Sequence, residues 1–190
     1  MIRESIITTS SKAGEVHIAP MGVIWRAGTP ILAPFRPSRT LDNLREHPAA
    51  VINHTDDVRV FAGCLTGRRD WPVHAGQHVD GWVLEGALAH QEIVVERFED
   101  DNIRPRFHCR VVHEAMHAPF RGFNRAQAAV IEAAILVSRL RLLPLEKIER
   151  EMTYLEIAVT KTAGPLEKEA WDWLAARVEA HRKEAARETA

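Results

Sequence analysis

The spacing of hydrophobic residues changes close to residue 121 of this 190-residue chain. Before that point, apolar residues alternate with polar ones or form short runs between turn residues, a pattern typical of β-strands. After it, "NRAQAAVIEAAILVSRLRLL" has apolar residues at positions 126, 129, 130, 133, 137 and 140, the spacing of one buried helix face. We therefore expect an α+β protein, with a β-rich domain over residues 1–120 and a helical domain over 121–190.

The first part of the chain predicts several strands and two short helices. "VHIAPMGVIWRAG" reads as a strand in two pieces, interrupted at residues 20–22, because proline removes a hydrogen-bond donor from a β-ladder. "ILAPF" and "AAVINHT" predict further strands, with a helix over residues 40–46 between them. "DDVRVFAGCL" predicts a short helix, and residues 66–81 read as a loop. Residues 82–115 are strand-like again.

Three helices are expected after residue 121. Asn124 can cap the first of them, because its side chain can accept hydrogen bonds from the first helical N–H groups. Pro144 opens the second helix, which we expect to end near Thr160. Gly164 and Pro165 then separate it from a third helix that ends near Arg187.

Composition and charge exclude several classes of protein. The chain has 25 Lys and Arg residues against 26 Asp and Glu residues, so it offers no general attraction to nucleic acid or to an anionic membrane. No apolar run is long enough to span a membrane, and the N-terminal residues lack a signal-peptide core. Its two cysteines, Cys64 and Cys109, are expected to be packing residues in a reduced, cytoplasmic protein.

The stretch "HEAMH", residues 113–117, matches the His-Glu-x-x-His pattern of zinc peptidases. That chemistry requires a helix, which brings both histidines to one face and the glutamate close to the metal-bound water. Upstream, "RFHCRVV" alternates like a strand, and Pro119 disfavours helix at residue 118. We interpret the stretch as the end of a strand with exposed histidines, and we expect no metal site. The alternative, a zinc-dependent hydrolase centred on His113, Glu114 and His117, predicts a helix over residues 111–118.

A basic, hydroxyl-rich stretch precedes the first predicted helix. Arg36, Ser38, Arg39 and Thr40 lie within five positions, between a strand and a helix N-terminus. Helix N-termini offer unpaired N–H groups and a positive dipole end, and guanidinium and hydroxyl groups beside them make a phosphate site. The alternative is that Ser38 or Thr40 is only the helix cap and that the arginines are solvated. The residues alone leave both interpretations open.

Two other strand positions add to the phosphate hypothesis. Met21 and Gly22 follow a proline inside a strand, where a ligand can approach the backbone. Asn53 ends a buried strand and can bond the carbonyls and nitrogens of a ring. Strand ends of a small β-barrel that line the phosphate and ring of a flat ligand would have this pattern.

Five segments, taken in order, resemble a small family of uncharacterised split-barrel flavoproteins known mostly from archaea and methylotrophic bacteria. They are "ESIITTSSKAGEVHIAPMGV", "PFRPSRTLDNL", "VINHTDDV", "GFNRAQAAVIEAAI" and "KTAGPLEKEAWDWL". The first half also resembles the wider group of flavin reductases and pyridoxamine-phosphate-oxidase-like proteins. In that group a Ser/Thr and basic stretch holds the FMN phosphate, and a strand that ends in Asn lies near the isoalloxazine ring.

The resemblance implies an FMN-binding split β-barrel over residues 1–120, with residues 107–115 as a late strand of the barrel. It also implies a homodimer with two flavin sites at the subunit interface. Its implied phosphate ligands are Arg36, Ser38, Arg39 and Thr40. Met21, Gly22 and Asn53 would meet the ring or the ribityl chain, and Lys161 and Thr162 of the "KTAG" motif would reach the site from the helical part. The nicotinamide-binding features of the reductases are not recognisable here. The resemblance therefore implies an FMN-binding protein with redox chemistry on an unknown substrate, and a deazaflavin user or a non-catalytic flavin-binding protein are its variants.

Overall fold

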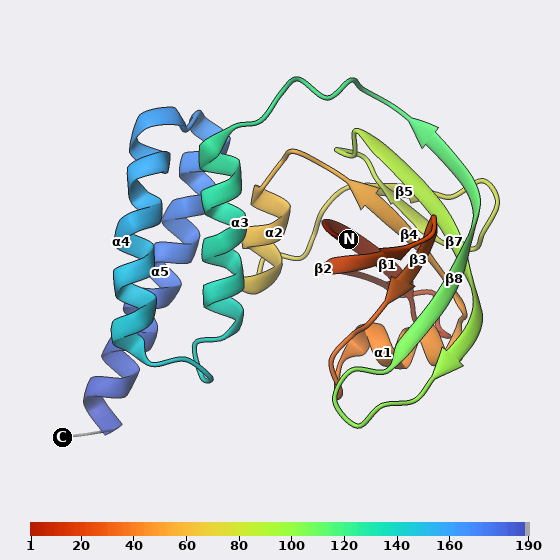
Figure 1. Ribbon diagram of the computed structural model, residues 1–190, viewed down its shortest axis with the longest axis horizontal. Coiled ribbons are helices and arrows are strands. Elements are labelled where there is room, and N and C mark those ends of the chain that lie inside the picture. The colour runs from red at the N-terminus through yellow and green to blue at the C-terminus, as the bar shows by residue number, and fades with distance from the viewer. Residues whose placement is uncertain (189–190) are drawn as a thin grey trace. The chain divides into compact units, whose positions relative to one another are not determined.

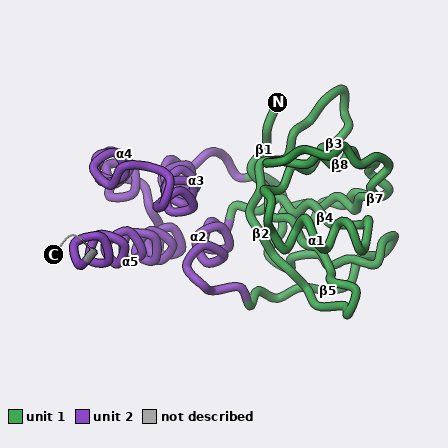
Figure 2. Tube along the Cα trace, turned by 90° about the horizontal axis from the view of Figure 1, so that it is seen from below, with its two compact units in different colours: residues 1–56, 70–120 green, residues 57–69, 121–190 purple. Residues whose placement is uncertain are grey.

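The structure, a computed structural model, describes residues 1–188 and combines β-strands with helices (Figure 1). These residues form two compact units (Figure 2). One unit comprises residues 1–56 and 70–120, and the other comprises residues 57–69 together with the chain from Arg121 onward. Residues 57–69, expected in the β-rich domain, belong to the helical unit in the structure.

Six strands of the first unit close into a barrel in the order β1-β2-β3-β8-β7-β4. The strands are β1 (Ile2–Ser10), β2 (Val16–Arg26), β3 (Thr29–Leu32), β4 (Ala49–His54), β7 (Ala89–Glu99) and β8 (Arg106–Met116). Each neighbouring pair is antiparallel, and β1 closes the ring by pairing with both β2 and β4. Closure gives each of these six strands a partner on both sides over at least part of its length. The predicted α+β class and barrel are confirmed.

The β2 strand is continuous through Pro20, which corrects the predicted interruption at residues 20–22. Pro20 lies opposite Ile6 of β1 in an unbroken register. The other neighbour, β3, pairs only with the end of β2, from Ile24 to Arg26. Around Pro20, β2 is therefore paired with β1 alone. The Pro20 nitrogen carries no hydrogen, so it can face the unpaired side of β2 without the loss of a hydrogen bond between strands.

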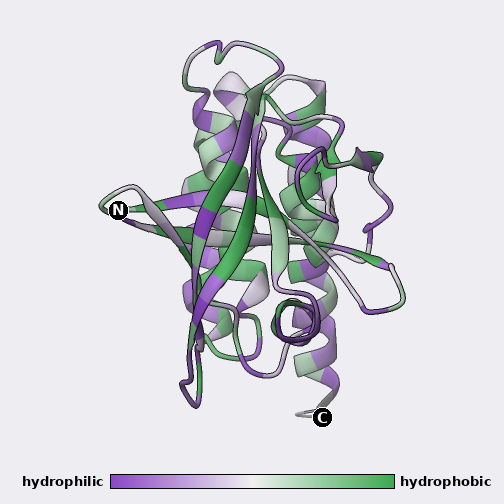
Figure 3. Ribbon diagram, turned by 90° about the vertical axis from the view of Figure 1, so that its right-hand side faces the viewer, coloured by the Kyte–Doolittle hydropathy of each residue, from purple (hydrophilic) through white to green (hydrophobic). Residues whose placement is uncertain are grey.

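Apolar side chains from all six barrel strands form one core. Its buried members are Ile7, Val23, Leu32, Leu41, Leu44, Ala50, Ile52, Ile93, Phe107 and Cys109. Leu41 and Leu44 come from α1 (Arg39–Glu46), an amphipathic helix whose polar face stays exposed. Figure 3 shows hydrophobic and hydrophilic positions mixed along the strands, as expected for strands with only one face in a core. Burial of its two leucines fixes α1, and with it the preceding loop, to the barrel.

A buried hydrogen-bond network centred on Asn53 ties three strands together. The Asn53 Nδ2 group donates to the Ile6 carbonyl at 3.2 Å and to the Thr8 Oγ1 atom at 3.3 Å, both on β1. Its Oδ1 atom accepts a 2.8 Å hydrogen bond from the Leu84 N–H of β6 (Trp82–Leu84). β6 pairs with β5 (Val73–Ala75) in a small second sheet. Asn53 thus holds this second sheet against the seam where β1 and β4 close the barrel.

The helical unit contains α2 (Arg59–Leu65), α3 (Arg125–Ser138), α4 (Leu145–Thr162) and α5 (Pro165–Glu188). Asn124 caps α3 as predicted, because its Oδ1 atom accepts from the N–H groups of residues 126 and 127. Val58, the N-cap of α2, and Ala62, within α2, are buried in the same core as residues of α3, α4 and α5. This packing explains why residues 57–69 belong with the helices. No helix within residues 1–188 is long and apolar enough to cross a membrane.

Candidate functional site

The predicted phosphate loop leads directly into α1. Ser38 is the N-cap: its backbone is extended, and its side chain accepts a 3.3 Å hydrogen bond from the Leu41 N–H. Thr40, in the first turn, is buried. The N–H groups of Arg39 and Thr40 have no acceptor within the helix, because the first N–H groups of any α-helix precede the available carbonyls. This helix start therefore combines a satisfied cap with backbone donors that can bind an anion.

The two arginines of this loop form exposed ion pairs. Arg36 pairs with Asp100, and Arg39 pairs with Glu15. The Arg39 side chain is 48% exposed and that of Glu15 is 67% exposed. Exposed ion pairs contribute only about 0–1 kcal/mol each. A phosphate group could therefore replace either carboxylate at small cost, so the pairs do not block an anion site.

The structure gives Met21, Gly22 and Asn53 different surroundings. Met21 is partly exposed and packs against the barrel core. A Cβ atom at Gly22 would lie 2.8 Å from the Ile2 side chain and 3.1 Å from that of Glu4, so the close approach at this glycine involves β1. The polar atoms of the Asn53 side chain all have partners within the barrel unit. Direct contact of these residues with a ring stays a prediction.

Lys161 and Thr162 end α4 in the helical unit. The Thr162 hydroxyl donates to the Ala158 carbonyl at 2.8 Å, and the Thr162 carbonyl accepts from Asn124 at 3.1 Å. These bonds join the end of α4 to the start of α3. The predicted role of Lys161 and Thr162 in a flavin site stays a prediction.

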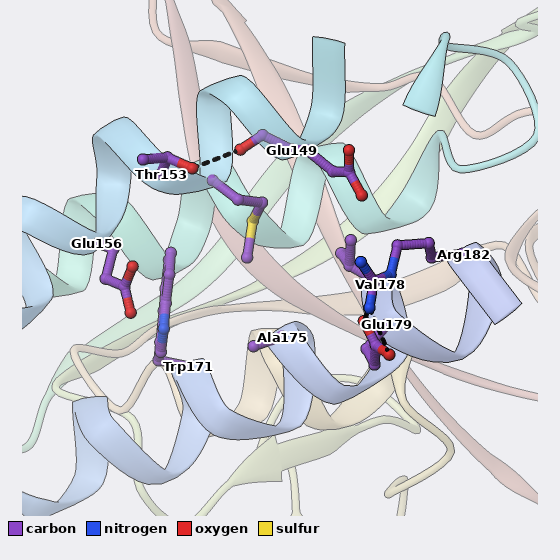
Figure 4. Close-up of a pocket in the computed structure, with 9 residues that line it drawn as sticks. Glu149, Thr153, Glu156, Trp171, Ala175, Val178, Glu179 and Arg182 are labelled. Carbon is purple, nitrogen blue, oxygen red and sulfur yellow. Dashed lines mark hydrogen bonds and ion pairs between the residues drawn. The ribbon is translucent and has the colours of Figure 1, made fainter. Parts of the chain in front are cut away.

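A surface groove of about 270 Å³ lies between α4 and α5 (Figure 4). Met152, Trp171 and Val178 give it an apolar part. Its charged lining consists of Glu149, Glu156, Glu179 and Arg182. Because Arg182 is already paired with Glu179 at 2.8 Å, the groove is acidic in balance. It therefore does not suit a phosphate ligand.

The His-Glu-x-x-His match lies on a strand, as predicted. β8 continues to Met116, so His113 and Glu114 point to opposite faces. The Glu114 carboxylate is exposed and accepts a 2.7 Å hydrogen bond from the Gln91 amide. A zinc peptidase needs a helix that brings both histidines and the glutamate to one ion. The helix over residues 111–118, which the hydrolase alternative predicts, is therefore wrong.

A cluster of titratable side chains that the sequence analysis missed surrounds His113. His90 and Glu92 of β7 share one face because they are two residues apart, and His113 lies directly opposite Glu92. The His113 ring stacks on that of His78 with centroids 4.2 Å apart. The Nε2 atom of His117 lies 2.8 Å from the Nδ1 atom of His90. Period-two spacing on the two strands was the signal that could have revealed the cluster.

Burial and backbone contacts shape the charges of this cluster. His90 is 3% exposed, and burial lowers its pKa, which favours the neutral imidazole. Glu92 is fully buried, and burial alone would raise its pKa. Its carboxylate, however, accepts hydrogen bonds of 2.7–2.9 Å from the N–H groups of Gln77, His78 and Val79. These bonds outweigh burial, so the pKa of Glu92 lies below its ordinary value and the group is an anion.

The fold and the polar loop together define an α+β protein built on a split β-barrel with a helical C-terminal unit. The chain belongs to the family described as protein of unknown function DUF447. The model of the family's N-terminal domain matches residues 3–118, and a second DUF447 model matches residues 124–176. No protein with a curated description matches the chain.

Solved structures share the fold. An FMN-bound DUF447 protein from Methanosarcina mazei aligns with a TM-score of 0.81 at 20% identity, over 93% of this chain and 94% of that one. The styrene monooxygenase flavin reductase of Pseudomonas putida has a TM-score of 0.52 at 14% identity, over 60% of this chain and 81% of its own. Nitrilotriacetate monooxygenase component B from Mycobacterium thermoresistibile has a TM-score of 0.53 at 16% identity, over 63% and 70%. At these identities the likeness shows the fold.

The cysteines are packing residues, and their reactivity can be predicted. Burial raises the pKa of Cys64 to about 11 and that of Cys109 to about 12. Since the thiolate is the reactive form, we expect neither thiol to react rapidly with a disulfide reagent at about pH 8 in the native protein. Both should react at once after unfolding in guanidinium chloride, which a colorimetric thiol assay can follow. Rapid labelling of one thiol in the native protein would contradict this assignment.

Proposed function

We propose that the protein is a flavoprotein that binds FMN with its phosphate at the N-terminus of α1. One observation carries the proposal: the barrel presents a helix start with unpaired N–H groups, flanked by Ser38, Arg39 and Arg36. The FMN-bound DUF447 protein from Methanosarcina mazei has the same fold over nearly the whole chain. Both the donor set and the family therefore support a phosphate-bearing flavin.

The donors suit a dianionic phosphate. The N–H groups of Arg39 and Thr40 would donate along the helix axis, where the dipole favours negative charge. Guanidinium groups can bind phosphate oxygens through two parallel hydrogen bonds, and charge-assisted bonds of this kind are stronger than exposed carboxylate pairs. The phosphate would therefore release Glu15 from Arg39 and Asp100 from Arg36. In this proposal, the two carboxylates keep the arginines extended until the ligand binds.

Bound flavin would supply hydride or electron transfer, and this is the basis for proposing an oxidoreductase. The chain's own residues bind the phosphate and set the position of the cofactor. Met21 offers a polarisable, partly exposed side chain for contact with a ring. Asn53 would act indirectly, by holding β1, β4 and β6 in place. A cytoplasmic location stays a prediction.

We also propose that two chains associate beside this loop. Phe35 is 56% exposed and Ile103 is 65% exposed, and both adjoin Arg36. The backbone N–H of Arg36 donates to the Ile103 carbonyl at 2.9 Å, and the Arg104 guanidinium lies 4.5 Å from the Phe35 ring centroid. Exposed apolar residues gathered at one place are typical of an association surface. A homodimer formed here would bring the second chain to the phosphate loop.

The phosphate proposal is tested by changing the charge at the helix cap without removing the cap. Ser38→Asp keeps a good N-cap but puts an anion where the phosphate would bind, whereas Ser38→Thr keeps a neutral hydroxyl. In titrations followed by flavin fluorescence, we expect Ser38→Asp to weaken FMN binding at least tenfold, or about 1.4 kcal/mol. Ser38→Thr should bind FMN much as the wild type does.

Riboflavin, which lacks the phosphate, is the matched ligand for this test. Its affinity should be the same in the wild type and in Ser38→Asp, because the substitution acts on the phosphate alone. Equal FMN affinity in Ser38→Asp and the wild type would contradict a phosphate site at α1. Reduction of bound flavin by NADH or NADPH would then separate an enzyme from a flavin carrier.

The association surface has its own test. Ile103→Asp places a charge in the apolar surface beside Arg36, so we expect it to shift the protein from dimer to monomer in sedimentation velocity. Ile157→Asp, a substitution at a 50% exposed position on α4, is the control and should leave the mass unchanged. The interface proposal fails if the wild type sediments as a monomer, or if Ile103→Asp remains dimeric.

A further inference from the structure

The side chains of His90, Glu92 and His113 converge within the barrel unit. One ligand atom from each of them lies within 4.8 Å of the others. Two neighbouring strands supply them in fixed register, because Glu92 of β7 pairs with His113 of β8 and His90 lies two residues from Glu92. Strands hold such positions more rigidly than loops do. The convergence is therefore a property of the barrel itself.

The cluster contains a buried polar atom without a hydrogen-bond partner. The Nε2 atom of His90 has none, although it lies 3.5 Å from the Oε1 atom of Glu92. If His90 donates from Nδ1 to His117, then Nε2 turns a lone pair toward a carboxylate oxygen. If His117 donates instead, a buried N–H lacks an acceptor in hydrogen-bond geometry. Each arrangement leaves a buried polar group unsatisfied, which is unfavourable.

A cation beside Nε2 would remove this conflict, because an imidazole lone pair and a carboxylate oxygen are both metal ligands. We propose that His90, Glu92 and His113 bind one divalent transition-metal ion. Two imidazole nitrogens and one carboxylate favour Zn²⁺ and its first-row neighbours over Ca²⁺ and Mg²⁺, which prefer oxygen ligands. In a tetrahedral zinc site, ligand atoms lie roughly 3.4 Å apart, so the side chains need to close by up to about 1.4 Å.

The surroundings support the ligands in the way that outer-shell groups support known metal sites. His117 contacts the Nδ1 atom of His90 at 2.8 Å, which orients the ring and leaves Nε2 for the ion. The loop N–H groups of residues 77–79 hold the Glu92 carboxylate. Gly76 allows this loop to approach, because a Cβ atom there would lie 2.9 Å from the Glu92 Oε2 atom. Stacking with His78 fixes the His113 ring.

The site differs from a zinc peptidase centre although it uses one of the histidines of that motif. Glu114 lies on the opposite face of β8, so it cannot activate a metal-bound water. The ligand carboxylate comes instead from β7. Because Glu92 also holds the loop over residues 77–79, an ion here would fasten that loop to the barrel wall. The metal proposal does not depend on flavin binding, since it uses none of the residues at α1.

The test uses untagged full-length protein treated with a chelator and then titrated with Co²⁺, whose visible d–d bands report ligand number and type. We expect saturation at one ion per chain, with the band intensity of a four- or five-coordinate site, displacement by Zn²⁺, and a rise in melting temperature. His113→Ala removes a partly exposed ligand and should weaken Co²⁺ binding at least about tenfold. His108→Ala, on the same strand but outside the cluster, is the matched control and should bind as the wild type does.

Melting curves without metal show whether each variant is folded. If His113→Ala proves unstable, His113→Phe keeps a ring that can stack on His78 without a ligand nitrogen, and it should show the same loss of binding. Absence of saturable binding in the wild type would overturn the proposal. Equal affinities in His113→Ala, or in its phenylalanine substitute, and in His108→Ala would overturn it too.

Discussion

The pairing of β1 with β4, which closes the barrel, is the constraint on which both candidate sites depend. Asn53 lies at this seam and bonds β1 on one side and β6 on the other. In the register of the sheet, Asn53 pairs with His90 of β7, so the seam also sets the position of the histidine cluster. On the other side, β4 follows α1 in the chain, and the buried Leu41 and Leu44 of α1 fix the position of the proposed phosphate loop. The fully buried Asn53 side chain thus helps to position both candidate sites, although none of its own polar atoms is exposed.

The two sites have opposite electrostatic character. At α1, unpaired N–H groups and two guanidinium groups favour an anion. At β7 and β8, the buried Glu92 carboxylate and the buried, neutral imidazole of His90 favour a cation. Because the net charge of the whole chain is only −1, neither preference is visible in the overall composition. Local geometry therefore carries more functional information here than composition does.

Most of the fold could be predicted from local patterns, because strand and helix periodicities act over a few residues. The strand over residues 49–54, α1, and the helices after residue 121 followed from spacing and capping. Two features depended on distant contacts. β2 tolerates Pro20 because β3 pairs only with its end, and α2 packs with the helices because Val58 and Ala62 enter their core. Neither contact partner can be read from the sequence next to these residues.

The two candidate sites also differ in whether they depend on local patterns or on distant contacts. Ser38 as a helix cap and Arg36 and Arg39 beside it could be recognised in one short stretch, whereas the histidine cluster joins residues from β7 and β8.

The most direct test of the flavin account is amide NMR during an FMN titration. The account predicts that the largest shifts occur at the N–H groups of Arg39 and Thr40. Unchanged signals for these two residues, with FMN bound elsewhere, would contradict it.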